Sequence, residues 1–570
     1  MTTNGARAIV DLLMKYQVEV IFGVPGDTSI AFYEALYDAQ PGIRHVMARD
    51  ERSASFMADA YARISRKPGV CECPSGAGPL YSVPGVAEAN ASSLPVILLT
   101  SDIPISGEGK NTITELDTAK LFESITKWSY LVKDAEKIPE TIRRAFRIAT
   151  TGRPGAVHLA LPQEALEGSV SDADRILFAE PECCSYPAYR TRGARAVLEQ
   201  VCDFLRQAKH PVIIAGGGAN HSQAEKALAN LAAWIAAPVV TTISGQGVIP
   251  DDHPLAMGVM GDNGFHPHAH RAVEEADVLL YIGCKMGSVS TINWTFPTPN
   301  PDRKIIQIDL NPIILSNNYQ NTISVAGDAK LVLEDLVTLL RDAVKQRTPS
   351  DWVNDLNQDR KKFWDAFNHD QNVPGSPIKP QKLIGTLNRH LTDTSIVIAD
   401  AGTPTPYITR YLKLGGNDSR FLIPRSYGGL GYAIPAVVGA HFARPDARLV
   451  GLFGDGSLGM SAGELETVAR LNIPVVLIHC NNAMFGWIKA LQKLHSNEKY
   501  FSVDFTAGNP TLVAEGFGLT AIKAESGEEL ELALQEAFST NGPVFIDAIT
   551  EPEVEKLPPV YSWLKAAGKI

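Results

Sequence analysis

Two short polar motifs in this chain have the residue types and spacing that metal and phosphate chemistry requires. The sequence GDGS at residues 454–457 follows the apolar run 449–453, and an Asn pair at 481–482 follows the apolar run 475–480. A helical pattern over 462–471 joins the two runs, which predicts a β-α-β unit whose polar motifs meet at one sheet edge. Carboxylate, amide and carbonyl oxygens suit Mg²⁺, and glycines let backbone N–H groups approach a diphosphate. The pattern therefore predicts a site for Mg²⁺ and a diphosphate.

The elements that must position these motifs follow the pattern of doubly wound parallel sheets. Short β-rich runs alternate with amphipathic helical stretches in three segments, which predicts an α/β fold with domains at 1–166, 190–346 and 376–556. The stretches 167–191 and 347–380 lack regular periodicity and are expected to be irregular connections. The strand candidates are 18–23, 45–48, 70–73, 96–100, 156–161, 211–215, 239–242, 278–282, 305–309, 396–399, 449–453, 475–480 and 544–548.

Composition places the chain among large enzymes of several domains. It has 570 residues, 45% of them apolar and 20% charged, and a formal net charge of −11, which argues against a nucleic-acid-binding surface. Its 7 cysteines form no C-x-x-C motif, which indicates a reducing compartment rather than a disulfide framework. The N-terminus resembles an amphipathic helix rather than a signal peptide, and no stretch is long enough to span a membrane. We therefore expect a cytoplasmic protein without membrane or nucleic-acid partners.

Four further stretches join the two motifs in a familiar order. They are FGVPGD at 22–27, RDERSASFMADAYAR at 49–63, GRPGAVHLALP at 152–162 and YGGLGYAIPA at 427–436. Together with GDGS and the Asn pair, they resemble the thiamin-diphosphate-dependent family of acetolactate synthases, pyruvate oxidases and decarboxylases, and 2-hydroxyacyl-CoA lyases. The resemblance covers essentially the whole chain and implies an N-terminal pyrimidine-binding domain, a central nucleotide-binding-like domain and a C-terminal domain that binds diphosphate and Mg²⁺.

The resemblance implies a role for individual residues. Glu51 is expected to hydrogen-bond the aminopyrimidine ring of the cofactor and so promote loss of the proton from the thiazolium carbon. Leu430 is expected to prop the two rings into a V, and Asp27 to handle protons. The implied magnesium ligands are Asp455, Asn482 and the backbone carbonyl of Met484. The other implied cofactor contacts are Gly402, Thr403, Gly454, Gly456, Ser457 and Gly486.

The resemblance also carries expectations about assembly and a second ligand. Because Glu51 and the metal site come from different subunits in such families, a homodimer is the expected minimal unit and a homotetramer the common assembly. The central domain of relatives holds FAD or ADP, and the matching positions here are Arg153, Lys285, Asp309 and Asp328. FAD-binding relatives usually carry GARF where this chain has GCKM at 283–286, so ADP or no nucleotide fits at least as well as FAD.

The substrate is less tightly defined. The stretch 103–111 lacks the His-His pair of pyruvate decarboxylases, which disfavours simple release of an aldehyde. The segment after the metal loop occupies the substrate-selecting helix of the family, which makes Trp487, Gln492 and Glu498 candidates for the substrate pocket. The tail 557–570 is a candidate lid over the site.

Three functions stay open. The first is an acetolactate-synthase-like carboligase, which decarboxylates a 2-oxo acid and joins the acyl carbanion to a carbonyl acceptor. The second is a lyase of the 2-hydroxyacyl-CoA or oxalyl-CoA decarboxylase type, which a basic group, Arg410, Lys413 and Arg425, would serve by binding the thioester. The third is a regulatory relative that binds the cofactor without turnover, and the intact Glu51 and Asp455 argue against it.

Overall fold

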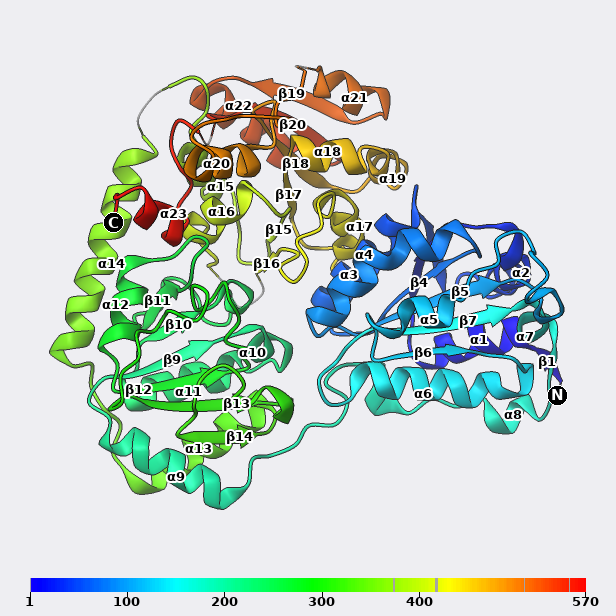
Figure 1. The fold of residues 1–570 in the computed structure, drawn as a ribbon, viewed down its shortest axis with the longest axis horizontal. Helices are drawn as coiled ribbons and strands as arrows, with labels where there is room; N and C mark the ends of the chain where they lie inside the picture. Colours follow the sequence, from blue (N-terminus) through cyan, green and yellow to red (C-terminus); the bar gives the residue numbers. More distant parts are fainter. Residues whose placement is uncertain (1, 373–374, 416–418, 507, 553) are drawn as a thin grey trace. The chain divides into compact units, whose positions relative to one another are not determined.

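The computed structural model describes residues 2–372, 375–415, 419–506, 508–552 and 554–570 (Figure 1). It contains three six-stranded parallel sheets flanked by helices, so the predicted α/β fold with three doubly wound sheets is confirmed. Within these described residues, no helix combines the length and the apolar character that crossing a membrane requires.

The N-terminal sheet has the strand order β3-β2-β4-β5-β7-β6. The strands are β2 Val20–Gly23, β3 Arg44–Met47, β4 Gly69–Cys73, β5 Val96–Asp102, β6 Trp128–Leu131 and β7 Val157–Pro162, with a separate antiparallel pair β1 Thr3–Asn4 and β8 Ser169–Val170. The helices are α1 Gly5–Lys15, α2 Ile30–Asp38, α3 Glu51–Ser65, α4 Ala77–Ala91, α5 Thr118–Glu123, α6 Ile138–Thr150, α7 Gln163–Glu167 and α8 Ala173–Ile176, with 3-10 turns at Asp27–Ser29, Ile105–Gly107, Ala135–Lys137 and Pro181–Cys184.

The central sheet has the order β11-β10-β9-β12-β13-β14, and its middle strands are continuous apolar runs. Every residue of β9 and β12 is buried, as expected for parallel strands with helices on both faces. The elements are α9 Arg195–Gln207, β9 Pro211–Ala215, α10 Gly217–His221, α11 Glu225–Ile235, β10 Val239–Thr241, β11 Ala256–Val259, α12 Pro267–Glu275, β12 Val278–Ile282, β13 Lys304–Asp309, β14 Ile323–Ala326 and α13 Ala329–Ala343, with 3-10 turns at Ile243–Gly245 and Pro312–Ile314.

The third sheet has the order β16-β15-β17-β18-β20-β19. Its elements are α15 Pro380–Asn388, β15 Ile396–Ala399, α16 Pro404–Tyr411, β16 Arg420–Leu422, α17 Ala433–Ala443, β17 Leu449–Gly454, α18 Asp455–Ser461, α19 Glu464–Arg470, β18 Val475–Asn481, α20 Gly486–His495, α21 Pro510–Gly516, β19 Thr520–Ala524, α22 Gly527–Ser539, β20 Val544–Ile549 and α23 Tyr561–Ala566.

The connection after the central sheet differs from its prediction. Most of the connection expected to be irregular over 347–380 is a 20-residue helix, α14 Asp351–Asp370. The Ser350 side chain caps its first turn by accepting a hydrogen bond from the Val353 N–H, and the helix buries Val353, Leu356 and Phe367. This apolar stripe is narrow, and charged residues cover the rest of the helix, which explains why the sequence appeared irregular.

The chain divides into two compact units that do not follow sequence order. Unit 1 comprises Met1–Tyr189, Pro424–Leu449 and Gly459–Ile473, and unit 2 comprises Arg190–Ile423, Val450–Leu458 and Pro474–Ile570. Helices α17 and α19 therefore belong with the N-terminal sheet, while the central and third sheets form unit 2. Within unit 1, α17 packs closely along α3.

The contact between α3 and α17 depends on a glycine. A Cβ atom at Gly439 would lie 2.0 Å from the Met57 carbonyl oxygen, which is far inside van der Waals distance. We predict that Gly439→Ala lowers the free energy of unfolding by about 1–3 kcal/mol, because the two helices must separate. Gly516→Ala is the matched control, since nothing lies within 4 Å of its added Cβ, and it should raise stability by up to about 1 kcal/mol. Urea unfolding followed by circular dichroism measures both, and equal shifts would contradict the packing described.

Candidate active site

The two polar motifs of the third sheet lie together at the carboxyl ends of β17 and β18. Asp455 is the first residue of α18, directly after β17. Its Oδ2 atom accepts a hydrogen bond from the Asn482 N–H at 3.2 Å. The crossover between the strands thus places the carboxylate and the amide residue side by side, and both are oxygen-bearing groups of the kind that Mg²⁺ prefers.

The loop after Asn482 has a backbone shape that orients its carbonyl groups. Ala483 adopts a left-handed conformation with φ 55°. The Phe485 N–H donates to the Val503 carbonyl at 2.7 Å, and the Phe505 N–H donates to the Ala483 carbonyl at 2.8 Å. Neither bond uses the carbonyl of Met484, which lies between them in an antiparallel bridge with Asp504. In such a bridge that carbonyl points away from the Asp504 segment.

A buried polar pair behind Asp455 escaped the sequence analysis. His479 Nδ1 lies 2.9 Å from Asp547 Oδ1, and His479 Nε2 lies 3.5 Å from Asp455 Oδ1. Asn481 Nδ2 also donates to Asp547 at 3.0 Å. Burial alone would lower the pKa of His479, but its hydrogen bonds to Asp455 and Asp547 and their negative charges raise that pKa above its usual value. His479 therefore lies directly behind the Asp455 carboxylate and is hydrogen-bonded to Asp547.

The register of the sheet explains this pair. His479 on β18 lies directly opposite Asp547 on β20. Each is an ionisable residue within an otherwise apolar, buried strand, VVLIHCN and VFIDAI. Lone ionisable residues in two buried strands were the available signal, but only the strand pairing reveals that they meet.

The predicted diphosphate contacts lie on loops of the same sheet. Gly402 and Thr403 follow β15 and precede α16, and Gly402 has φ +100°, a conformation that favours glycine. An added Cβ at Gly402 would meet no atom within 4 Å, so the loop has open space beside it. Gly454 ends β17, Gly456 and the buried Ser457 lie in the first turn of α18, and Gly486 begins α20.

The candidate substrate residues have partners within unit 2. The Trp487 ring packs on Trp563 with centroids 4.4 Å apart. The Gln492 side-chain amide exchanges two hydrogen bonds of 3.0 Å with the backbone of Phe501, so it braces the segment after α20. Glu498 lies in an exposed turn with φ 58°. Ile488 of α20, between these candidates, is 47% exposed.

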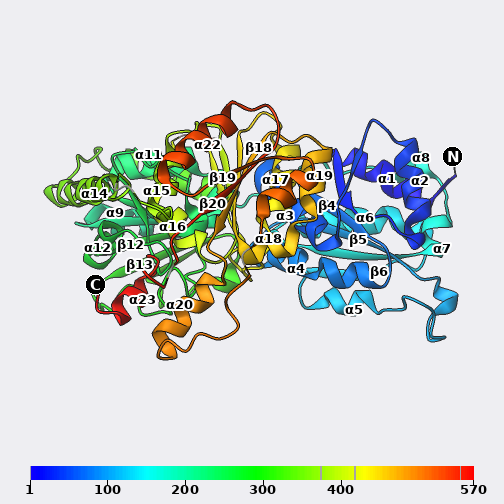
Figure 2. The ribbon, with the colours of Figure 1, turned by 90° about the horizontal axis from the view of Figure 1, so that it is seen from above.

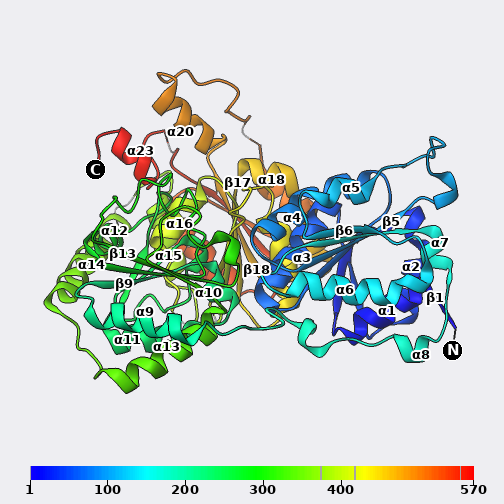
Figure 3. The same cartoon turned by 60° about the horizontal axis from the view of Figure 1, so that its bottom comes forward.

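The candidate lid, residues 557–570, packs against other elements of unit 2. Tail helix α23 lies beside α20, as Figure 2 and Figure 3 show. Asp262 accepts hydrogen bonds from the Ser562 N–H at 2.7 Å and from the Ser562 hydroxyl at 2.9 Å. Trp563 is buried against Trp487. The tail therefore braces the helix that the sequence had associated with substrate.

In unit 1, Glu51 lies at the start of α3, just after the edge strand β3. Asp50 caps the helix by accepting a hydrogen bond from the Ser53 N–H at 2.8 Å. An added Cβ at Gly78 would lie only 3.2 Å from Glu51 Oε1, so the glycine keeps space beside the carboxyl. Burial raises the pKa of Glu51 above its ordinary value, and the charges of Asp50 and Glu72 add to the rise. This carboxyl is suited to hold a proton at a higher pH than an ordinary glutamate.

Sequence reasoning also missed the buried carboxyl of Glu72 on β4. Tyr33 donates a hydrogen bond to it, and His45 Nε2 lies 3.6 Å from its Oε1 atom. Its position inside an apolar strand was the signal, as for Asp547. Asp27, by contrast, is exposed in the turn after β2 and accepts a hydrogen bond from the Thr28 N–H at 2.9 Å.

Leu430 lies in a segment that runs along α3. Tyr432 packs its ring on Phe56 with centroids 5.2 Å apart and donates a hydrogen bond to Asp59 at 2.6 Å. An added Cβ at Gly429 would lie 3.4 Å from the Phe56 ring. The structure thus brings the Leu430 segment and the helix that begins with Glu51 together in unit 1.

The residues predicted to contact a nucleotide are largely engaged in local structure. Arg153 donates to Ser93 and to the carbonyls of Asn90 and Ala91 within unit 1. Asp328 is buried, caps α13 and pairs with Arg190 at 3.1 Å. Asp309 accepts a hydrogen bond from the Asn311 N–H at 2.8 Å, and Lys285 is exposed.

The glycine run after β9 serves loop packing. An added Cβ at Gly216 would lie 2.3 Å from the Gly283 carbonyl oxygen, and the Gly218 N–H donates to the same carbonyl at 2.9 Å. These glycines let the loops after β9 and β12 touch, which differs from a cradle that leaves room for a pyrophosphate.

Comparison with known proteins agrees with this geometry. Models of thiamine pyrophosphate enzymes match three parts of the chain: the N-terminal TPP binding domain over 3–121, the central domain over 198–336 and the C-terminal TPP binding domain over 400–548. The probable acetolactate synthase large subunit of Methanocaldococcus jannaschii is 35% identical over 567 residues, covering 98% of this chain and 93% of that protein.

Other relatives give the same result. The probable acetolactate synthase large subunit of Methanococcus aeolicus is 33% identical over 564 residues, with 96% of this chain and 92% of that protein covered. The acetolactate synthase large subunit of Haemophilus influenzae is 31% identical over 555 residues, with 95% and 94% covered. The chain therefore belongs to the family of thiamine-pyrophosphate-dependent enzymes related to the acetolactate synthase large subunits.

Proposed function

We propose that this enzyme is an acetolactate-synthase-like carboligase. It decarboxylates a 2-oxo acid and transfers the acyl carbanion to a carbonyl acceptor, with thiamin diphosphate and Mg²⁺ as cofactors. One observation carries the proposal: the Asn482 N–H donates to Asp455 Oδ2 at 3.2 Å, which places both residues at the sheet edge where two glycine loops also lie. Acetolactate synthases among the relatives support the same reaction class.

The residues of unit 2 fit the metal and diphosphate end of the cofactor. In this proposal Asp455, Asn482 and the Met484 carbonyl hold Mg²⁺, since all three supply oxygen ligands. The open Gly402 loop, with Thr403, and the first turn of α18, with Ser457, hold the phosphates through N–H and hydroxyl donors. His479 Nε2 lies 3.5 Å behind Oδ1 of the Asp455 carboxylate.

The residues of unit 1 fit the reactive rings. When bound, thiamin diphosphate supplies a nucleophilic carbon and accepts the electron pair when a neighbouring C–C bond breaks. Glu51 holds a proton at the pyrimidine nitrogen, a role that its raised pKa supports. Leu430 supplies an apolar prop between the rings, and Asp27 is exposed at the same sheet edge for proton transfer in the acyl step.

The thioester-cleaving alternative has less support. The acetolactate synthases among the relatives favour the carboligase. Two of the three basic residues assigned to a thioester are also engaged elsewhere. The Arg410 guanidinium lies over the rings of Phe265 and Phe363, and the Lys413 ammonium lies 4.2 Å from the ring centre of Trp364. These cations pack against aromatic rings within unit 2.

Assembly and boundaries complete the proposal. We infer a homodimer as the minimal unit and a homotetramer as the assembled form, in the cytoplasm. Exposed apolar side chains near the Glu51 edge of the N-terminal sheet, Leu80, Tyr81 and Ile113, are suited to a subunit interface.

We propose domains at 1–166, 190–346 and 376–556, with 557–570 as a tail over α20. We propose that the central domain holds ADP or no nucleotide rather than FAD, since it carries GCKM at 283–286 where FAD-binding relatives usually carry GARF.

The proposed function predicts the product of the reaction. Incubation of the protein with thiamin diphosphate, Mg²⁺ and pyruvate should yield acetolactate and CO₂, which NMR of the reaction mixture identifies. If pyruvate is untouched and a 2-hydroxyacyl-CoA is instead cleaved to formyl-CoA and a carbonyl compound, the carboligase proposal is wrong.

The proposed function also predicts the effect of replacing Glu51. Glu51→Gln should lower kcat by about 10²–10⁴-fold, because the carboxyl can no longer exchange a proton with the cofactor. Glu140→Gln is the matched control, since this exposed glutamate of α6 lies 62% exposed and away from the sheet edge. Steady-state kinetics with pyruvate measures both variants, and full activity of Glu51→Gln would refute the assigned role.

A further inference from the structure

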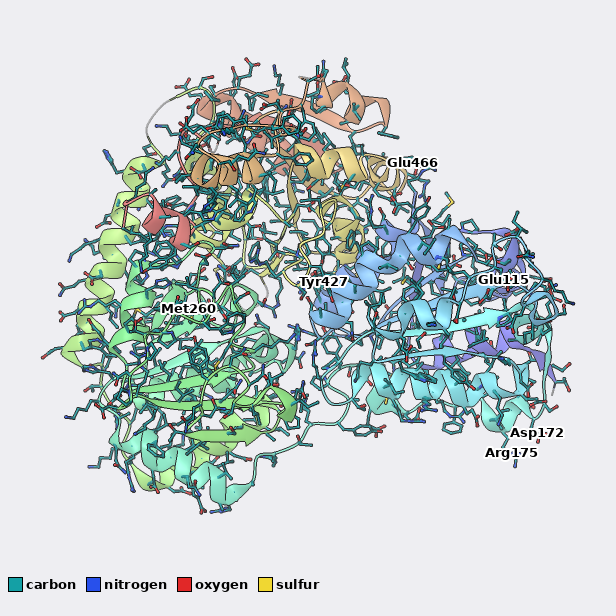
Figure 4. The ribbon with its side chains drawn as sticks, viewed as in Figure 1. Glu115, Asp172, Arg175, Met260, Tyr427 and Glu466 are labelled. Carbon is teal, nitrogen blue, oxygen red and sulfur yellow. The ribbon has the colours of Figure 1, made fainter. Side chains whose placement is uncertain are left out.

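Three consecutive backbone N–H groups in unit 1 point at one buried carboxylate. Glu88 of α4 is 1% exposed. Its Oε1 atom accepts hydrogen bonds from the N–H groups of Arg425 at 3.0 Å and Ser426 at 3.1 Å, and its Oε2 atom accepts from Tyr427 at 2.8 Å. Tyr427 is labelled in Figure 4. Successive N–H groups that converge in this way form a nest for an anion, so a side chain of the protein itself fills this nest.

A second buried carboxylate holds the other end of the same segment. Tyr432 donates its hydroxyl proton to Asp59 Oδ2 at 2.6 Å, and Asp59 is fully buried on α3, the helix that begins with Glu51. The Tyr432 ring also packs on Phe56. The segment 425–432 is therefore attached to two neighbouring helices, α4 at its start and α3 at its end.

One arginine links the two anchors. Arg63 Nε donates to Asp59 Oδ2 at 2.6 Å, and Arg63 Nη2 lies 3.5 Å from Glu88 Oε1. A single cation thus serves two buried carboxylates. Burial raises the pKa of Asp59 despite the nearby Arg63 charge, which reflects the cost of holding this group in the interior. Buried ionic groups are a weak source of stability, and their best-attested benefit is a single defined conformation.

Between the anchors the segment is intrinsically pliable. Gly428 has φ +67° and Gly431 has φ +82°, and both flank Leu430 closely. Glycines lose more backbone entropy on ordering than other residues, so this turn needs external attachment to keep one shape. The attachments come from α3 and α4, which also carry Glu51 and the Gly78 position beside it.

We propose that Glu88 and Asp59, linked by Arg63, are positioning residues that clamp the segment 425–432 and so hold Leu430 in one position. The inference rests on the proposed role of Leu430 as the prop between the cofactor rings. The clamp acts without touching the cofactor. Its loss should leave cofactor affinity almost unchanged but slow the proton step that depends on ring geometry.

The first test uses the protein without cofactor. Glu88→Gln weakens one anchor by replacing an acceptor oxygen and the negative charge, and Tyr432→Phe removes the other; hydrogen-exchange mass spectrometry follows peptides that cover 425–432. We expect amide exchange there to speed up by at least about tenfold, since a tenfold change corresponds to the ~1.4 kcal/mol typical of one hydrogen bond. Tyr186→Phe is the matched control, because it removes a buried hydroxyl that donates to the Ala62 carbonyl of the same α3 helix at 2.9 Å. Unchanged exchange in both anchor variants would overturn the clamp.

The second test uses the protein with thiamin diphosphate and Mg²⁺ added. NMR follows exchange of the thiazolium C–H proton with D₂O, and calorimetry gives the cofactor Kd. The clamp predicts at least about tenfold slower exchange in Tyr432→Phe and Glu88→Gln, with Kd changed less than about threefold, and no change in Tyr186→Phe. Tyr432→Phe keeps the ring packing on Phe56, so it carries the test if Glu88→Gln does not fold.

The outcomes separate the clamp from the proposed function. If the unmodified protein does not accelerate the exchange over free cofactor, the proposed function fails. If it does so and Glu51→Gln abolishes the acceleration, while Tyr432→Phe and Glu88→Gln keep the full rate, the proposed function stands and the clamp is wrong.

Discussion

Parallel strands joined by crossover helices end at one edge of their sheet, and the proposed chemistry of this chain depends on that constraint. Asp455 and Asn482 follow β17 and β18, and Gly402 follows β15. In unit 1, Asp27 follows β2 and Glu51 follows β3. Each residue is therefore placed by the end of a strand. Within each sheet, residues far apart in sequence become neighbours because their strands end at the same edge.

The interior supports these edges with buried polar groups. Asp547 and His479 pair across neighbouring strands, and His479 lies 3.5 Å behind Asp455. Glu88 and Asp59, on helices, accept hydrogen bonds from the Leu430 segment. Such groups cost free energy to bury and are tolerated when every member is hydrogen-bonded. Their common feature is that each lies beside a segment to which the proposal assigns a role in binding the cofactor.

Periodicity predicted the buried strands and missed five of the six edge strands of the large sheets, β3 being the exception. Of the seven strands it missed, β6, β11, β14, β16 and β19 are edge strands of the six-stranded sheets, and β1 and β8 form the separate two-residue pair. Edge strands are short or partly exposed, as β6 and β19 are, so they carry mixed residues rather than continuous apolar runs. Helix α14 was missed for the related reason that its buried stripe is narrow.

The candidate site shows the same division. The proximity of Asp455 and Asn482 follows from the β-α-β unit, and the pattern of apolar runs in the sequence predicted that unit. The His479–Asp547 pair depends on strand register, which the sequence does not reveal. The Glu88 nest depends on the fold bringing 425–427 to α4, more than 300 positions away in sequence. Local motifs were thus predictable, whereas the buried groups that orient them required the tertiary structure.

The most direct test of the account is a calorimetric titration of the metal-free protein with thiamin diphosphate, with and without Mg²⁺, for the unmodified chain and for Asp455→Ala. Binding that requires Mg²⁺, and that weakens by at least about 100-fold (~2.8 kcal/mol) in Asp455→Ala, is the predicted result. Equal affinity in the two proteins, or binding that ignores Mg²⁺, would contradict the central claim that the β17 and β18 ends hold the metal and the diphosphate.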